Sequence, residues 1–283
     1  MNPFIQRYEQ LGWEFAPVYP KQCLRINNLK VDERELVKRL DSKKINLKRV
    51  PFLEQGYYAR SRFSLGATPE YLLGLYALQE AVSQLPVKVL KPEGIVLDCC
   101  AAPGGKTAQI AEKAEMVVAL ESQSSRVPSL INNLERLGVK NALVYNVDAR
   151  AFEPDFKFDK ILVDAPCSGN FVTDKTWFEK QSISNFITRQ KLQKEILASA
   201  FGLLSEKGEL VYSTCSLEPE ENEMVLQWAI DNLGAKVLPT ECIGVKGLTN
   251  IFGKNLDSQI QNAKRIWPSI ADTQGFFIAR LKK

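Results

Sequence analysis

The sequence contains no histidine among its 283 residues. This absence excludes Ser-His-Asp and Cys-His catalytic groups and removes the most common metal ligand, so any chemistry must use Cys, Asp, Glu, Lys or the backbone. The six cysteines show no CxxC spacing, which predicts reduced thiols rather than disulfides, and no metal site. No run approaches the roughly 18 apolar residues of a membrane helix, and the segment MNPFIQRYEQ lacks the apolar centre of a signal peptide. We therefore expect a cytoplasmic protein with no membrane partner.

Excess charge is also absent from most of the chain. Residues 1–87 hold 13 Lys and Arg against 9 Asp and Glu, whereas residues 88–283 hold 24 of each, so the net charge of +4 lies in the first region. This pattern fits either a mixed solvated surface or a unit that binds a polyanion. We place a domain boundary near Pro86, which predicts an N-terminal domain of residues 1–87 and a second domain of residues 88–283.

The C-terminal two thirds alternates short β-rich apolar runs with helical patterns. This alternation is typical of an α/β fold in which helices cover both faces of a parallel sheet. The predicted strands are residues 94–100, 116–121, 142–146, 160–165 and 209–214, with a last strand at 275–281 that can lie antiparallel at the end of the sheet. The predicted helices are residues 104–113, 124–137, 188–204 and 219–233.

Residues 1–87 show a different pattern. A strand is predicted over QCLRINNLKV, a helix over DERELVKRLDS and a second strand over NLKRVPFL, which together indicate a small α+β unit. Residues 69–85 predict a further helix, and PVKVLKPEG then leads into the parallel sheet.

The segment DCCAAPGGKT, residues 98–107, follows the first strand of that sheet and opens a helix. A triphosphate loop requires GxxxxGK[ST], but Cys100 stands where its first glycine belongs, and the dinucleotide pattern GxGxxG also fails. What remains is a turn of small residues before a helix N-terminus, where backbone amides approach a ligand closely. Acidic residues follow the next three strands: Glu121, Asp148 and Asp164. Acids at strand ends suit a nucleoside with an amine-bearing tail, so S-adenosylmethionine fits better than a polyphosphate.

Two cysteines lie in turns just beyond strands, Cys167 in DAPCSGN and Cys215 in YSTCSLEPEENE. Cys215 precedes a predicted helix, whose N-terminus lowers the pKa of a thiol, although the nearby glutamates oppose this effect unless a cation such as Lys106 is close. Other buried cysteines are usually inert small hydrophobes. We interpret the following cysteines in that way: Cys23, Cys99 and Cys242.

Together these segments resemble the Sun/NSUN family of RNA (cytosine-5) methyltransferases. The resemblance rests on DCCAAPGGKT, NNLERLGVKN, DAPCSGN, YSTCSLEPEENE and RIWPSIADTQGFFIARL, in this order across residues 88–283, and on LRINNLK and LQEAVS before them. GNFVTDKTWFEK is most similar to short archaeal-type tRNA methyltransferases. The resemblance implies a Rossmann-like class I S-adenosylmethionine methyltransferase sheet behind a small N-terminal α+β RNA-binding domain. It also implies a monomer that methylates RNA, with tRNA favoured over rRNA.

The resemblance assigns roles to individual positions. The loop around the methionine part of S-adenosylmethionine comprises Cys100, Ala101, Ala102, Pro103, Gly104, Gly105 and Lys106. Glu121, Asp148 and Asp164 match acids that contact the ribose, the adenine, and the amino-acid end or target base, with Arg126 nearby. Cys215 matches the nucleophile, and Cys167 matches the cysteine that helps release the product.

The chemistry of cytosine explains why two thiols are needed. Carbon 5 becomes nucleophilic only after a thiolate adds to carbon 6, the role predicted for Cys215. Negative charge then develops at N3, where a protonated Asp164 would donate. The later loss of the carbon 5 proton is a second proton transfer, which suits Cys167. Two alternatives stay open here, a nucleotide hydrolase and an RNA-binding relative without turnover.

Because a base is reached from both faces only when it is unstacked, we expect a single-stranded or flipped nucleotide. Cations of the N-terminal unit would contact the RNA backbone. These are Arg25, Lys30, Lys38, Arg39, Lys43, Lys44, Lys48, Arg49, Arg60 and Arg62. Tyr57, Tyr58 and Phe63 suit either base stacking or core packing.

Overall fold

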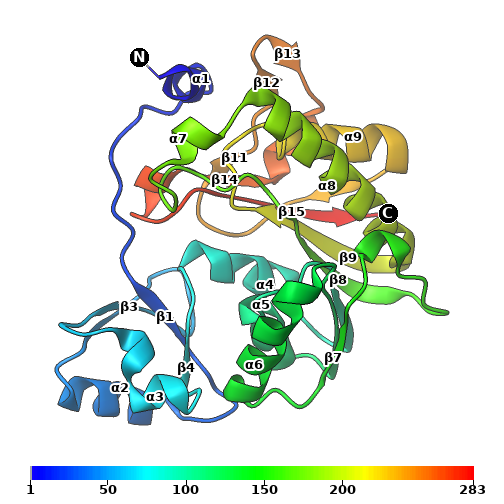
Figure 1. Cartoon of the computed structure of the whole chain (residues 1–283). Helices are drawn as coiled ribbons and strands as arrows, with labels where there is room; N and C mark the ends of the chain where they lie inside the picture. Colours follow the sequence, from blue (N-terminus) through cyan, green and yellow to red (C-terminus); the bar gives the residue numbers. More distant parts are fainter. Residues whose placement is uncertain (1) are drawn as a thin grey trace.

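The computed structural model describes residues 2–283 and contains a large central sheet and a smaller N-terminal sheet (Figure 1). The central sheet has the order β11-β14-β15-β9-β8-β5-β6-β7, and β10 also pairs with β15. Strands β5 to β9 run parallel, whereas β15 lies antiparallel to β9, as predicted for the last strand. The strands are β5 (Ile95–Asp98), β6 (Met116–Leu120), β7 (Ala142–Tyr145), β8 (Phe158–Asp164), β9 (Leu204–Thr214), β10 (Lys236–Leu238), β11 (Val245–Lys246), β14 (Lys264–Ile266) and β15 (Phe276–Lys282).

Helices cover both faces of this sheet because its strands present alternate apolar residues to the two sides. Leu97 and Val118 pair across β5 and β6 and pack on the side of α8 and α9, whereas their neighbours Val96 and Val117 pack on the side of α4 and α5. The predicted α/β fold is confirmed. The helices are α4 (Leu85–Leu90), α5 (Gly105–Ala111), α6 (Val127–Leu137), α7 (Trp177–Lys180), α8 (Ile183–Leu203) and α9 (Glu223–Leu233). A short hairpin, β12 (Asn250–Ile251) and β13 (Lys254–Asn255), precedes β14.

The N-terminal residues form the predicted α+β unit, an antiparallel sheet in the order β2-β3-β1-β4. Its elements are β1 (Cys23–Ile26), α2 (Glu33–Ser42), β2 (Asn46–Arg49), β3 (Gly56–Arg60), α3 (Pro69–Leu72) and β4 (Tyr76–Leu78). Leu36 and Leu40 of α2 pack with Leu24, Ile26 and Tyr57 on one face of this sheet. The division at Pro86 stays a prediction.

The predicted helix over residues 69–85 is wrong. The segment instead contains α3, then Gly74 at φ +73°, then β4, which pairs antiparallel with β1. A Cβ at Gly74 would lie 1.8 Å from the Arg136 carbonyl oxygen, so the chain turns there in close contact with the end of α6. The helix that enters the parallel sheet is α4, in the stretch where a plain connection was expected.

Helix α1 (Pro3–Gln10) lies apart from the rest of the N-terminal unit, next to α7 (Figure 1). Phe4 and Tyr8 pack with Trp177, Phe186 and Trp267 in an aromatic cluster at the carboxyl ends of the central strands. The first residues of the chain therefore support the second region. Among residues 2–283, no helix combines the length and the apolar character that crossing a membrane demands.

Candidate active site

The glycine loop joins β5 to α5 at the carboxyl ends of the parallel strands. The Ala101 amide donates to the Leu120 carbonyl over 2.9 Å, which holds the loop on the sheet. Gly104 has φ +101°, and a Cβ there would lie 2.9 Å from the Leu130 side chain of α6. The other side of the loop borders a cavity of about 230 Å³. Of the predicted site residues, the cavity is lined by Cys100, Ala101, Ala102, Pro103, Gly105, Lys106 and Asp164.

The three predicted acids occupy different surroundings. Glu121 is buried behind the loop, where its carboxylate accepts from the Ala102 amide at 3.3 Å. Arg126 contacts both Ala102 and Glu121. It donates to the Ala102 carbonyl at 2.6 Å, and its guanidinium lies 3.5 Å from the Glu121 carboxylate. Asp148 instead accepts from Arg150, and that hydrogen bond lowers the pKa of Asp148. Asp148 lies outside the residues that line the cavity, so its contact with adenine stays a prediction.

Lys106 and Asp164 form an ion pair of 2.6 Å at the edge of the cavity. Asp164 also accepts from the Ser213 hydroxyl at 2.7 Å, so both carboxylate oxygens have donors. Burial opposes the positive charge of Lys106, but the Asp164 carboxylate outweighs burial and raises the pKa of Lys106. The donation from a protonated Asp164 stays a prediction.

The two predicted cysteines meet at the ends of β8 and β9, with their Sγ atoms 3.0 Å apart. The hydrogen bond from Cys167 lowers the pKa of Cys215, and the Lys106 ammonium lowers it further. The same hydrogen bond, together with burial, raises the pKa of Cys167. Of the two thiols, Cys215 therefore has the lower pKa, which is the direction that a nucleophile requires.

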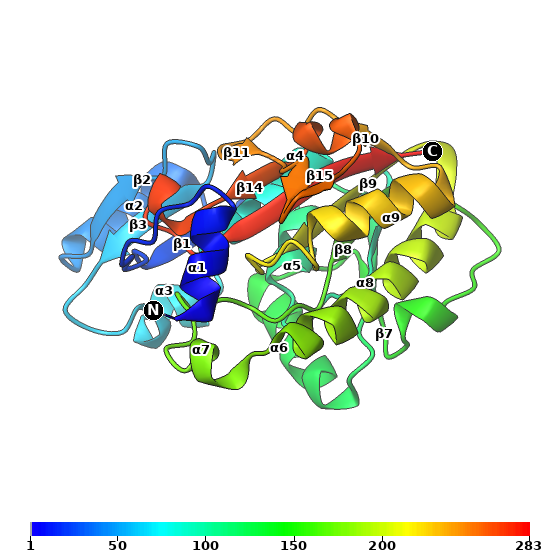
Figure 2. The same ribbon diagram turned by 90° about the horizontal axis from the view of Figure 1, so that it is seen from above.

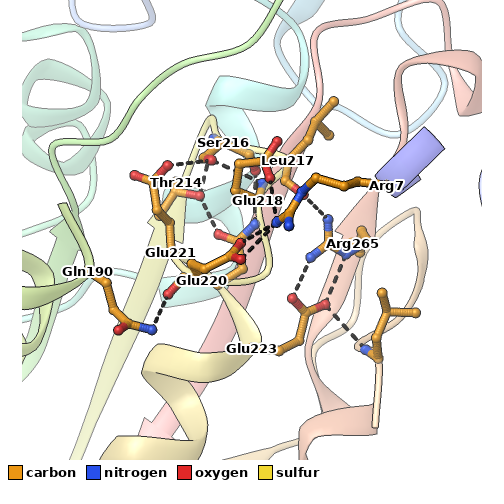
Figure 3. Close-up of polar contacts among 12 residues, drawn as sticks. Arg7, Gln190, Thr214, Ser216, Leu217, Glu218, Glu220, Glu221, Glu223 and Arg265 are labelled. Atoms are coloured by element: carbon orange, nitrogen blue, oxygen red, sulfur yellow. Dashed lines mark hydrogen bonds and ion pairs between the residues drawn. The ribbon is translucent and has the colours of Figure 1, made fainter. Parts of the chain in front are cut away.

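One buried carboxylate, not identified from the sequence, connects the two cysteine turns. Glu221 accepts from the Ser168 amide at 3.0 Å and from the Ser168 hydroxyl, next to Cys167. It also accepts from the Ser216 hydroxyl at 2.8 Å, next to Cys215, and from Gln193 of α8 at 2.8 Å. The signal in the sequence is the acidic run LEPEENE, most of which falls within the helix predicted over residues 219–233. Burial of these glutamates distinguishes them from a solvated run, and Figure 3 shows their polar contacts.

Two arginines lie beside the segment after Cys215 (Figure 3). Arg265 and Glu223 form an ion pair in which both side chains are fully buried, and Arg265 also donates to the Leu217 carbonyl at 2.6 Å. Arg7 of α1 contacts Glu218 at 3.2 Å. Burial raises the pKa of Glu218 to about 7, although Tyr8 and Arg7 oppose the shift. The turn that carries Cys215 is therefore fixed by residues distant in the sequence.

The expected RNA-contacting cations divide into two groups. The prediction that Arg25 contacts RNA is wrong, because its side chain is 1% exposed and pairs with Glu112, the residue after α5. Lys30 donates to the Arg136 carbonyl at 2.6 Å and joins the N-terminal sheet to α6. Tyr57 is core, whereas Phe63 is exposed. The remaining cations lie at least partly exposed: Lys38, Arg39, Lys43, Lys44, Lys48, Arg49, Arg60 and Arg62.

Comparison with known protein families adds a second line of evidence. Residues 87–282 match the 16S rRNA methyltransferase RsmB/F family, and residues 3–81 match the N-terminal domain of 16S rRNA methyltransferase RsmF. The chain belongs to the RsmB/F family. The predicted Sun/NSUN resemblance is thereby confirmed, and with it the class I methyltransferase fold.

Individual relatives agree with this assignment. The chain is 36% identical to a human 28S rRNA (cytosine(4447)-C(5))-methyltransferase over 92% of its own length and 34% of that protein. It is 35% identical to ribosomal RNA small subunit methyltransferase F of Vibrio parahaemolyticus over 93% of its length and 57% of that protein. The chain thus spans about a third to somewhat over half of the curated relatives that it matches.

Solved structures match over nearly the whole chain. A methyltransferase homolog from Pyrococcus horikoshii superimposes with a TM-score of 0.85 and 40% identity, covering 95% of this chain and 87% of that one. NSun6 from the same organism, solved with SFG, has a TM-score of 0.82 and 25% identity, covering 95% of this chain and 91% of that one.

Proposed function

We infer that this protein transfers a methyl group from S-adenosylmethionine to carbon 5 of a cytosine in RNA, through a temporary bond between Cys215 and carbon 6. The observation that carries the proposal is the 3.0 Å separation of Cys167 and Cys215, in turns adjoining the Lys106–Asp164 pair that borders the loop cavity. Family membership supports the reaction class. Neither alternative, a nucleotide hydrolase or a relative without turnover, explains two thiols in contact beside this cavity.

The residues around the cavity suit S-adenosylmethionine. The small residues of the loop allow a close approach of the backbone. Behind the loop, Glu121 and Arg126 hold the Ala102 peptide group. When bound, the cofactor supplies an electrophilic methyl group on a sulfonium.

The thiols act in sequence. The Cys215 thiolate adds to carbon 6, and the electron pair passes to carbon 5, while the negative charge that develops at N3 faces Asp164. Lys106 carries the proton that the ion pair can pass to Asp164. Once Cys215 is bonded to carbon, it no longer accepts from Cys167 or repels its negative form, so the pKa of Cys167 falls. Cys167 gives its proton to bulk water, and the resulting thiolate removes the carbon 5 proton. The electrons of that carbon–hydrogen bond re-form the carbon 5–carbon 6 double bond and expel Cys215 as a thiolate.

The substrate class is RNA, and its finer identity is a separate part of the proposal. The tRNA preference from the sequence stays a prediction, since curated relatives are named for 28S and small-subunit rRNA. Transfer of tritiated methyl groups to tRNA and to rRNA fragments, compared under one set of conditions, tests both.

Two variants test the assigned roles. Cys215→Ala is expected to reduce transfer at least about a thousandfold, as removal of a covalent nucleophile does. Cys167→Ala is expected to retain a protein–RNA adduct, seen as a slow band on a denaturing gel. Cys242→Ala, at a thiol packed against the core outside these turns, is the control. Equal loss of activity in both site variants with no adduct would contradict the roles.

A further inference from the structure

Strands β2 and β3 present an open face beside the C-terminal segment before β15. Asn46 pairs with Arg60 and Lys48 pairs with Tyr58 across the two strands. Because side chains alternate along a strand, these four residues share one face, while Leu47, Tyr57 and Ala59 turn toward α2. A groove of about 760 Å³ lies along this face, and residues 270–272 form its opposite wall. Figure 2 shows the orange-red turn before β15 next to β2 and β3.

The other half of the same sheet face is closed. Arg25 of β1 is buried and contacts Gln79 at 2.9 Å and Glu112, the residue after α5, so β1 and β4 pack on the methyltransferase domain. Cys23 and Tyr58 contribute to the core on that side. Only β2 and the outer part of β3 remain accessible, which places any ligand of this face in the groove.

The groove has the chemistry of a site for single-stranded nucleic acid. Lys21, Lys48 and Arg60 line it, and the acid that lines it, Asp272, is neutralised by Lys21 at 2.8 Å. Within residues 2–283, neither Lys48 nor Arg60 has a salt-bridge partner, and both are exposed. Tyr58 lies between them and is half-buried, with the Lys21 ammonium over its ring at 5.5 Å from the ring centre. Cations around an aromatic ring attract phosphates and stack a base.

The groove also lies near the candidate nucleophile. Asn170 donates to the Cys215 carbonyl at 2.7 Å and to the Gly275 carbonyl at 3.3 Å, so these two oxygens are no more than 6 Å apart. Asp272 precedes Gly275 by three residues, a span of at most about 11 Å. The wall of the groove is therefore within roughly 20 Å of Cys215, about six stacked nucleotides at about 3.4 Å each.

We propose that this groove binds an unpaired segment of the RNA substrate a few nucleotides from the target cytosine, stacking a base on Tyr58 and holding phosphates with Lys48 and Arg60. The inference rests on the proposed function and adds a recognition site to it. It explains why the N-terminal sheet keeps half of one face open while using the other half to dock.

The test measures the binding of a short, labelled single-stranded RNA with one central cytosine by fluorescence anisotropy. Lys48→Ala with Arg60→Ala is expected to weaken binding at least about tenfold and to reduce the salt slope of log K by about 1.4, the share of two phosphates. Tyr58→Leu is expected to weaken binding about five- to a hundredfold, with less change in salt slope. The affinity for S-adenosylmethionine should be unchanged in both variants.

The control is Lys207→Ala with Lys236→Ala, an equal loss of charge at exposed positions of the central sheet that do not line the groove. It is expected to change affinity less than about threefold. Equal weakening in control and groove variants, or none in either, overturns the inference. Unchanged RNA affinity with an altered oligomeric state would assign the groove to a second copy of the chain. Failure of the wild-type protein to transfer methyl groups, with groove-dependent RNA binding intact, would instead contradict the proposed function.

Discussion

The turns that carry the two cysteines and the groove on the N-terminal sheet use polar residues in opposite ways. The segment after Cys215 carries three fully buried glutamates, Glu218, Glu221 and Glu223, and each accepts a hydrogen bond from a defined partner. In the groove, Lys48 and Arg60 are exposed and have no ion-pair partner among the described residues 2–283. Bond formation requires sulfur atoms held to within fractions of an ångström, whereas attraction of phosphates acts over about 10 Å and tolerates mobile side chains.

The largest expected effect comes from breaking the buried ion pair between Arg265 and Glu223. Arg265→Leu leaves the Glu223 carboxylate buried without its partner, so the free energy of unfolding should fall by about 3–5 kcal/mol. Urea unfolding followed by circular dichroism measures this loss. Arg265→Met with Glu223→Gln should recover most of it, because no uncompensated charge remains.

An exposed ion pair gives the matched control. Arg39 and Glu35 are four residues apart on α2, with about half of each side chain exposed. Arg39→Ala should therefore change the free energy of unfolding by about 0.5 kcal/mol or less. An Arg265→Leu variant as stable as Arg39→Ala would show that the buried network does not hold the Cys215 segment.

The next effect separates positioning from charge at Glu221. Glu221→Gln removes an acceptor that joins the two cysteine turns, so kcat for methyl transfer should fall about 10- to 100-fold with RNA affinity unchanged. Loosening the turns weakens the hydrogen bond from Cys167, which raises the pKa of Cys215. Loss of the Glu221 charge alone would lower that pKa instead.

The pH dependence of Cys215 alkylation, followed by mass spectrometry, decides between these directions. Glu220→Gln is the control, since the Glu220 carboxylate contacts Arg7 rather than the cysteine turns. A lowered alkylation pKa in Glu221→Gln with kcat near that of the wild type would mean that Glu221 acts only through its charge.

The same contrast explains what the sequence allowed us to predict. The parallel strands and the position of Cys167 and Cys215 followed from patterns within about ten residues, and the structure brings these cysteines together. The turn at Gly74 could not be predicted, because it depends on contact with Arg136, more than sixty residues away. Glu221 was missed for a similar reason, since its partners come from separate segments of the chain.

Exposure was the other property that the sequence left open. Arg25 and Lys48 are both basic residues of β strands, yet one is buried against α5 and the other lines a groove. The face of the N-terminal sheet that is covered depends on how the whole N-terminal unit docks. Local sequence patterns therefore do not predict which face is covered. The excess of Lys and Arg over residues 1–87 therefore described the region as a whole, but it did not show which of these side chains are exposed.

The smallest expected effect is a pH dependence of stability from Glu218. Its pKa is raised to about 7 by burial, from an ordinary value near 4.5, so the folded protein binds more protons than the unfolded chain between these limits. Stability contributed by this group is fully present below about pH 4.5 and is lost as pH rises through 7. Glu218→Gln should therefore unfold with a midpoint that declines less between pH 5 and 7 than that of the wild type. Thermal unfolding at several pH values measures the difference, with exposed Glu206→Gln as control. Identical slopes for all three proteins would mean that the Glu218 carboxylate is already ionised when the protein folds, held so by Arg7 and Tyr8.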